Sequence, residues 1–345
     1  MKYRASIIVK DPKYLGNKWF SDDPLVIRDN QNACYIALRD VLSKNGIDLA
    51  TEDVNKPEDS DLVIRLDVSR DGYRKRQHQK SYLFLIEPPV VNKYNWDRKY
   101  HSGYDRVFTW NDSLVDGKNY FLLRLAYKLR FDGSIGDIHR KKLCSMIIGY
   151  KFSRGASELY SERLAAINWF TRNHPEDFEY YGEGWPSYLF PYFGTRMAGL
   201  FPVLESRMPK SILERIFPKN TGYRGRAASK SHVLNRFKFS ICYENMHSVP
   251  GLITEKIFDS FSAGCVPVYL GASNVAELIP AGCFIDRRGF KNYGELYKFM
   301  TRMEDRTYLN YLNNIEYFIH SNAAKVFSAD HFANTLARYI LEDIC

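Results

Sequence analysis

Short apolar runs with the length of strands alternate with amphipathic, helix-like segments along most of this chain. In the first half, the helix-like segment ACYIALRDVLSKNG, which ends at Gly46, lies among the strand-like runs RASIIVK, DLVIRLD, SYLFLIEPP and YDRVFTWND. In the second half, the helix-like SELYSERLAAINWFTRN accompanies the strand-like runs CSMIIGY, DFEYYGEGWP, FKFSICYEN and VPVYLG. Strands that alternate with helices predict an α/β architecture with mostly parallel sheets.

The length of the chain favours two domains. It has 345 residues, and a single hydrophobic core stops growing at roughly 250–300 residues. The segment FDGSIGDIHRKK, residues 131–142, has two glycines, several charges and little periodicity, which is typical of a linker. We therefore predict domains over residues 1–135 and 142–325, and a C-terminal helix over 326–345 that packs back on the first domain.

Composition is that of an ordinary soluble globular protein, with 45% apolar and 26% charged residues. No apolar stretch is long enough to span a bilayer, and the apolar part of MKYRASIIVKDPKYLG is too short for a signal peptide. The six cysteines show no short paired spacing, so we expect them to be reduced and to bind no zinc. These features predict a cytoplasmic protein.

The net charge of +9 is concentrated in short basic clusters. They are RKRQHQK at 74–80, HRKK at 139–142 and YRGR at 223–226. A single cluster of this kind is usually a solvated surface. Together they could also attract an anionic small molecule, an anionic glycan or nucleic acid, and the charge alone does not choose among these.

A dense polar cluster precedes the helix-like run IFDSFSAG. Thr254 is placed as the N-cap of this helix and Gly264 as its C-terminal stop. The first turn presents free backbone N–H groups, Lys256 adds a full positive charge, and the neighbouring Glu255 can accept hydrogen bonds from two hydroxyl groups, as of a ribose. This pattern predicts a site for a nucleotide or a nucleotide-sugar; the alternative is a capped helix whose charged residues face water.

A second candidate is Glu87, which ends the apolar strand SYLFLIE immediately before Pro88 and Pro89. Proline removes the donor that would continue the sheet, so Glu87 should lie at the carboxyl end of a buried strand, where open parallel sheets bind ligands. Apolar surroundings raise the pKa of a carboxyl group, which suits a general base. The alternative is a surface glutamate before a turn.

The order of these motifs resembles one known family. Residues 236–293, which contain FKFSICYEN, ITEK, VPVYLG and IPAGCFID, resemble the donor-binding signature of glycosyltransferase family 10, the alpha-1,3-fucosyltransferases, in its soluble bacterial or viral form. LFLIEPP resembles the family's strand that ends in a glutamate before proline. Two departures concern the sugar: Leu252 replaces an aromatic residue, and the loop that contains His247 and Pro250 is one residue longer.

The resemblance implies a GT-B fold, two Rossmann-like domains facing across a cleft, with the acceptor on the N-terminal domain and the nucleotide-sugar on the C-terminal one. It implies an inverting transfer of a sugar, with fucose from GDP-fucose the first expectation, to a glycan hydroxyl such as that of lipopolysaccharide or capsule. No obligatory metal or other cofactor is implied besides the nucleotide-sugar donor. A cytoplasmic location, with a peripheral contact at the inner membrane, fits this expectation.

Site roles follow from the resemblance residue by residue. Glu87 is the expected general base, Glu255 would bind the ribose, and Lys256 and Arg163 would meet the diphosphate. The other expected donor-binding residues are Gly182, Gly184, Lys230, Lys238, Glu244, Asn245 and Thr254. No metal ligands are predicted, and the acidic pair in Asp59-Ser60-Asp61 is read as solvated.

Three further interpretations stay open. The basic clusters also fit a protein that binds DNA or glycosylates a modified base in it. A catalytically silent sugar-nucleotide binder would carry the same donor motif. The aromatic run Trp185, Tyr188, Phe190, Tyr192 and Phe193 could be a platform for a sugar or base ring, or packing under a long loop.

Overall fold

A computed structural model describes residues 2–9, 11–23, 26, 32–69, 75–133, 142–153, 155–185, 201–216 and 221–344. The chain divides into two compact units. The first contains Met1–Leu129, Val249–Glu255 and Ser321–Cys345, and the second contains Arg130–Ser248 and Lys256–His320. Each unit is built on one parallel sheet.

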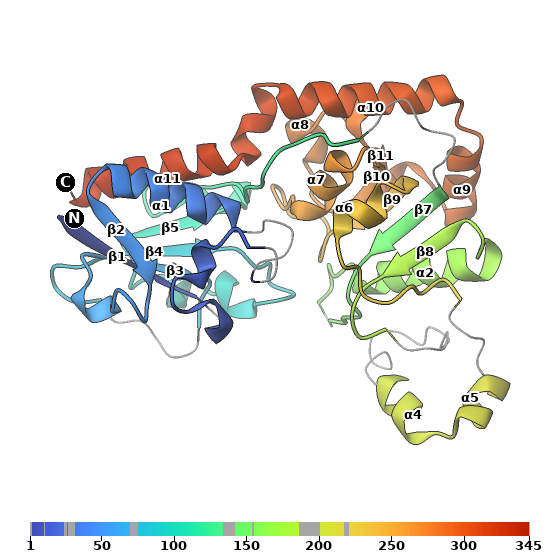
Figure 1. The fold of residues 1–345 in the computed structure, drawn as a ribbon, viewed down its shortest axis with the longest axis horizontal. Coiled ribbons are helices and arrows are strands. Elements are labelled where there is room, and N and C mark those ends of the chain that lie inside the picture. Colours follow the sequence, from blue (N-terminus) through green and yellow to red (C-terminus); the bar gives the residue numbers. More distant parts are fainter. Residues whose placement is uncertain are drawn as a thin grey trace. The chain divides into compact units, whose positions relative to one another are not determined.

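The first unit has a six-stranded sheet in the order β2-β1-β3-β4-β5-β6. The strands are β1 (Tyr3–Ile8), β2 (Ile47–Thr51), β3 (Leu62–Leu66), β4 (Lys80–Leu85), β5 (Arg106–Thr109) and β6 (Tyr120–Leu122). Helix α1 (Ala33–Lys44) connects β1 to β2 and lies beside α11 (Ala329–Ile344) over one face of this sheet (Figure 1). Short 3-10 turns occupy most of the other connections.

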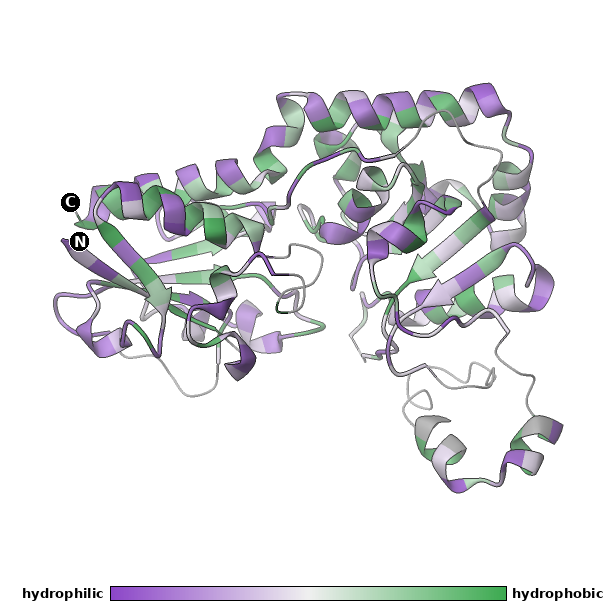
Figure 2. Cartoon of the chain, viewed as in Figure 1, coloured by the Kyte–Doolittle hydropathy of each residue, from purple (hydrophilic) through white to green (hydrophobic). Residues whose placement is uncertain are grey.

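Both faces of this sheet are buried, which explains why its strands are nearly continuous apolar runs. Tyr82 and Phe84 of β4 pack in one core with residues of α1 and α11, whereas Leu83 and Leu85 join a second cluster with Val107. Figure 2 shows this as hydrophobic colour along the strands and alternating stripes on α1 and α11. The predicted strand SYLFLIE is therefore confirmed as a central, buried strand.

The second unit has a five-stranded sheet in the order β11-β10-β9-β7-β8. Its strands are β7 (Lys142–Ile147), β8 (Phe178–Tyr181), β9 (Phe237–Tyr243), β10 (Val266–Leu270) and β11 (Ile285–Asp286). Its helices are α2 (Tyr160–Asn173), α4 (Phe201–Arg207), α5 (Lys210–Ile216), α6 (Lys230–Leu234), α7 (Glu255–Ser262), α8 (Val275–Leu278), α9 (Tyr293–Thr301) and α10 (Asp305–His320). Helix α7 ends before Gly264, whose φ of 62° confirms the predicted stop.

From Pro186 to Lys230 the sequence is aromatic and basic without a clear period, which predicts a long irregular segment. This prediction is wrong in part, because α4 and α5 lie inside the segment. KSILERI consists mainly of good helix formers, and Pro202 and Pro209 stand at the beginnings of α4 and α5, where proline is tolerated. The central part of the predicted linker and Tyr188, Phe190, Tyr192 and Phe193 lie outside the described residues.

The five cysteines in the described part of the chain are buried and form no disulfide: Cys34, Cys144, Cys242, Cys265 and Cys283. Burial raises the pKa of Cys34 and Cys283 to about 12 and that of Cys242 to about 11, so all three remain thiols at neutral pH. Among the helices described, none is both long and apolar enough to cross a bilayer.

Candidate active site

Arg163 and Asn245 meet at the carboxyl edge of the second sheet. Arg163 lies in the first turn of α2, which follows β7, and its side chain is buried. Its Nη2 donates to the backbone oxygen of Tyr243 at 2.7 Å and to Asn245 Oδ1 at 3.0 Å. Two residues predicted from separate motifs are therefore joined at the end of β9.

Glu244 and Lys256 form an ion pair at the same edge. Lys256 Nζ lies 3.2 Å from Glu244 Oε2, and the lysine side chain is 17% exposed while the glutamate side chain is fully buried. Lys256 belongs to the first turn of α7, where backbone N–H groups have no partner within the helix. The pair thus places an ammonium group beside a helix N-terminus, an arrangement that attracts anions.

Glu244 is enclosed from the other side by the end of β10. A Cβ atom at Gly271 would lie closer than 3.0 Å to Glu244 and to the hydroxyl of Tyr269, so only glycine fits there. Burial, together with the negative charge of Glu244, holds the pKa of Tyr269 well above its usual range. Glu244 was predicted to bind the donor, but because it is fully buried it can act on a ligand only through Lys256.

Gly182 and Gly184 follow β8 at this edge and are needed for close backbone packing. At Gly182, with φ of 148°, a Cβ atom would collide with the backbone oxygen of Ile148 at the end of β7. Gly184 has φ of 79°, in the left-handed region, and the indole of the next residue, Trp185, donates to the same Ile148 oxygen at 2.6 Å. The Gly-x-Gly turn is accordingly explained by chain geometry, with a donor contact still a prediction.

Lys230 and Lys238 each form an ion pair with an aspartate. Lys230 Nζ lies 2.8 Å from Asp259 Oδ2, one turn beyond the beginning of α7. Lys238 is the second residue of β9, and its Nζ lies 3.6 Å from Asp305 Oδ1. Because Lys238 is at the amino end of the strand that carries Glu244 beyond its carboxyl end, the structure does not bring it to the candidate site, and we withdraw it.

Thr254 and Glu255 belong to the segment that groups with the first unit. Thr254 is buried at the position before α7, and Glu255 is the first helical residue and is half-buried. The chain passes from the first unit to the second between Glu255 and Lys256. Glu255 and Lys256, predicted to bind the ribose and the diphosphate, are therefore neighbours in the sequence that group with different units.

Glu87 lies at the carboxyl edge of the first sheet, two residues beyond β4, and is half-buried. Its backbone is held by Asp67, which follows β3 and whose Oδ1 accepts from the N–H groups of Ile86 at 2.6 Å and Glu87 at 3.0 Å. Asn95 completes this support, since its Nδ2 donates to Asp67 Oδ1 at 2.6 Å and to the Glu87 backbone oxygen at 2.9 Å. The position of Glu87 is thus fixed through its main chain.

Sequence reasoning missed Asp67 and Asn95, although Asp67 ends the predicted strand DLVIRLD next to the strand of Glu87. It also missed a cluster beside Arg163. In that cluster Glu162 accepts from the Tyr293 hydroxyl at 2.6 Å, and the Arg287 guanidinium lies 4.5 Å from the Tyr293 ring centroid. No motif marked these residues.

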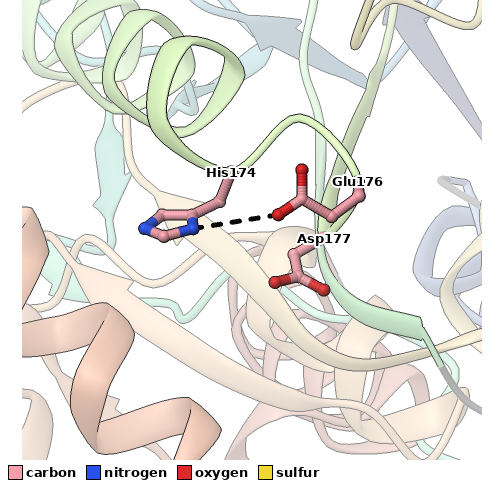
Figure 3. A group of neighbouring side chains, drawn as sticks. All are labelled: His174, Glu176 and Asp177. Atoms are coloured by element: carbon pink, nitrogen blue, oxygen red, sulfur yellow. Dashed lines mark ion pairs between the residues drawn. The ribbon is translucent and has the colours of Figure 1, made fainter.

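Among the residues that the structure describes, one group of metal-type ligands lies at the opposite edge of the second sheet. His174, Glu176 and Asp177 precede β8, and their ligand atoms lie within 4.8 Å of one another (Figure 3). Packing accounts for two of them, because the His174 ring stacks on Tyr297 at 3.5 Å and Asp177 accepts from the Tyr297 hydroxyl at 2.6 Å. We assign no metal to this group.

In the described part of the basic clusters, four cations are paired with acids: Lys75, Lys142, Arg224 and Arg226. Glu179 of β8 is almost fully buried and lies 2.6 Å from Lys142 Nζ, 3.2 Å from Arg224 Nε and 3.2 Å from Arg236 Nη2. Burial raises the pKa of Glu179, but the hydrogen bonds from Lys142 and Tyr181 and the nearby cations outweigh it and lower this pKa to about 2. These cations therefore stabilise a buried carboxylate.

Part of the chain is similar to a known family of glycosyltransferases. Residues 206–338 match the family model described as glycosyltransferase family 10 (fucosyltransferase), C-terminal. The chain is 30% identical over 95 residues to alpha-(1,3)-fucosyltransferase FucT of Helicobacter pylori, a match that covers 26% of this chain and 20% of that protein. It is 40% identical over 81 residues to the mouse 4-galactosyl-N-acetylglucosaminide 3-alpha-L-fucosyltransferase 9, covering 22% of each. The matched segments thus span about a fifth of these relatives.

Solved structures resemble the chain over nearly its whole length. An alpha1,3-fucosyltransferase with GDP has a TM-score of 0.54 at 15% identity, covering 99% of this chain and 90% of that one. Anabaena Alr3699/HepE with UDP and glucose scores 0.55 at 10% identity, covering 99% and 100%. An alpha-glucosyltransferase with UDP and mismatched DNA scores 0.53 at 9% identity, with the same coverage. These are GT-B glycosyltransferases, and the chain has the GT-B fold.

Proposed function

We propose that this chain is an inverting glycosyltransferase that transfers fucose from GDP-fucose to a hydroxyl group of a glycan, such as lipopolysaccharide or a capsule polysaccharide. The observation that carries the proposal is the Glu244–Lys256 pair at the first turn of α7. It lies within residues 206–338, the segment that matches the fucosyltransferase family model. Similarity to fucosyltransferases supports GDP-fucose over other donors.

The donor would be held by its diphosphate and its ribose. The N-terminus of α7 and the Lys256 ammonium supply positive potential for the diphosphate, and Glu255 accepts hydrogen bonds from the ribose hydroxyls. Glu244 fixes the position of the Lys256 ammonium group through their ion pair. Arg163 places a buried positive charge behind Asn245.

In the transfer step, the acceptor hydroxyl oxygen attacks the anomeric carbon from the face opposite the diphosphate. The bond from that carbon to the phosphate oxygen breaks, GDP leaves with the electron pair, and the hydroxyl proton passes to the carboxylate of Glu87. Charge grows on the leaving diphosphate, and Lys256 and the helix terminus offset it. Loss of one such donor typically raises a barrier by about 2.7–4 kcal/mol.

The donor is tested by a thermal-shift screen of the purified chain against GDP-, UDP-, CMP- and dTDP-sugars, since a ligand that binds only the folded state raises its melting temperature. We expect the shift with GDP-fucose. UDP-glucose belongs in the screen because two structures of the same fold are UDP complexes. A shift with UDP-glucose alone would overturn the assignment of the donor.

The reaction is tested by release of GDP in the presence of lipopolysaccharide and capsule glycans, with Glu87→Gln as the matched variant. This substitution keeps shape and removes the base, so transfer should be lost while affinity for GDP-fucose is retained. Transfer by the variant at the wild-type rate would refute Glu87 as the base. Donor binding without transfer or hydrolysis by the wild type would identify a silent binder.

A further inference from the structure

The loop Val249–Glu255 rests on three residues of the first unit. Gly251, in the middle of this loop, has φ of 83°. A Cβ atom there would lie closer than 3.0 Å to the Trp110 backbone oxygen and to Arg124 Nη1, and 3.0 Å from Asp112 Oδ2. The loop backbone therefore touches Trp110, Asp112 and Arg124, which we call the loop seat.

The loop seat is a hydrogen-bonded unit in its own right. Arg124 Nη1 donates to the Trp110 backbone oxygen at 2.8 Å, and Arg124 Nη2 donates to Asp112 Oδ1 at 2.6 Å. The Arg124 side chain is only 9% exposed. A guanidinium that donates to two separate acceptors has a fixed orientation, and so the surface it offers to the loop is fixed as well.

The same tryptophan also contacts the strand end that carries the candidate base. The Trp110 indole Nε1–H donates to the backbone oxygen of Ile86 at 2.8 Å, one residue before Glu87. Trp110 is 1% exposed and packs against Trp96, with ring centroids 5.4 Å apart. One buried residue thus supports the peptide next to Glu87 with its side chain and the Gly251 loop with its main chain.

We propose that Trp110, Asp112 and Arg124 are positioning residues, which hold the loop so that Glu255 stands at a fixed place relative to Glu87. This inference rests on the proposed function. The three residues act through the loop and do not touch the donor. The seat requires glycine at position 251, because any side chain there would push the loop away from Trp110 and move Glu255 with it.

The test compares two glycine variants with the same backbone requirement. Gly46 has φ of 79° and open space where a Cβ would stand, so Gly46→Ala introduces the strain alone, whereas Gly251→Ala adds the collision with the seat. We expect Gly251→Ala to raise the KM for GDP-fucose on the order of 100-fold, the scale for a misplaced binding group. Gly46→Ala should keep the wild-type KM. Equal KM values for both variants would overturn the proposal.

A second pair of variants covers the case in which Gly251→Ala does not fold. Arg124→Gln removes the paired donors, and Arg124→Lys keeps the charge and one donor. We expect KM for GDP-fucose to increase in the order wild type, Lys variant, Gln variant, with the KM for the acceptor unchanged. A purely structural role would lower the melting temperature of both variants without changing either KM, and that result would contradict the proposal.

Hydrogen exchange separates this inference from the proposed function, because it needs no substrate. The N–H of Ile253 bonds to the Gly251 oxygen at 2.9 Å within the loop. In Arg124→Gln its exchange should accelerate relative to wild type, while amides of α1 keep their rates. Unchanged exchange at Ile253 refutes the seat even if the chain transfers fucose. Faster exchange in a chain that does not use GDP-fucose supports the seat and refutes the proposed function.

Discussion

Lys256 Nζ lies 3.2 Å from Glu244 Oε2, in a pair whose acid is fully buried and whose base keeps 17% of its side-chain surface. The two residues of the pair therefore have different roles. The glutamate can meet nothing but protein, whereas the ammonium group remains accessible at the beginning of α7. This asymmetry makes stability and ligand binding separable by mutation.

Replacing Lys256 by Met should destabilise the fold, because Glu244 is then left as a buried charge without its cation. Removal of one partner of a buried pair typically costs about 3–5 kcal/mol, and the partial exposure of Lys256 places the expected loss at the lower end. Urea unfolding of the wild type and Lys256→Met measures it.

The double variant Glu244→Gln/Lys256→Met serves as the control for this prediction. Without the buried charge, most of the lost stability should return, but affinity for GDP, measured by calorimetry, should stay low. If the double variant recovers GDP affinity, Lys256 has no part in the donor site.

Gly182→Ala should be among the most damaging single substitutions in the second unit. Its Cβ would collide with the Ile148 backbone oxygen, and backbone cannot move as a flexible side chain does. We expect a loss of more than about 3 kcal/mol in the free energy of unfolding.

Gly184→Ala is the matched control, since its Cβ would meet its nearest neighbour, the Tyr150 Cβ, at an ordinary 3.6 Å. Only the left-handed backbone is strained there, which costs on the order of 1 kcal/mol. If denaturant unfolding gives equal losses in the free energy of unfolding for the two variants, the chain beyond β7 and β8 can move apart enough to relieve the collision between position 182 and Ile148.

Glu179 should make the protein sensitive to acid. Its pKa is lowered from 4.5 to about 2, so its contribution to stability is fully present above pH 4.5 and is lost as the pH falls towards 2. The shift corresponds to a contribution of at most about 3 kcal/mol, because water screens cations whose side chains are 42–50% exposed. In Glu179→Gln this pH dependence should disappear. Parallel stability curves for the two proteins between pH 2 and pH 5 would contradict the role of Glu179.

His101 should make the stability of the fold depend on pH under less acidic conditions than Glu179 does. It is 5% exposed, and its Nδ1 lies 2.9 Å from the Tyr120 hydroxyl. Burial, aided by Arg98, lowers its pKa below the ordinary 6.5, despite smaller opposite effects from Asn95 and Asp97. The unfolded chain therefore binds the proton more readily, and stability should decline as the pH falls below 6.5. Unfolding between pH 5 and pH 8 should show this slope in the wild type and lose it in His101→Gln.

Elements with local signals could be predicted from the sequence. SYLFLIE ends at two prolines, and the helix after Thr254 has a glycine stop, so both were placed within one or two residues of their observed ends. Helices α4 and α5 were missed because aromatic and basic residues around them obscure the helical period.

Long-range partners could not be predicted in the same way. Nothing near Glu244 in the sequence shows that its side chain is closed off by Gly271, and nothing near Gly251 points to Trp110. Lys238 stands at the amino end of β9, away from the strand end next to Glu244, and only the structure shows that its partner there is Asp305. Motifs identify residue types, while burial and pairing decide their roles.

Asp67 has a left-handed backbone, with φ of 60°, and its side chain receives three N–H groups in an enclosed space. Two independent constraints therefore restrict which amino acids position 67 can accept. The torsion angle favours Gly, Asn and Asp, and the converging donors demand an oxygen atom. Aspartate alone meets both demands in full, with asparagine the nearest substitute, so deep mutational scanning should show this position among the least tolerant in the chain.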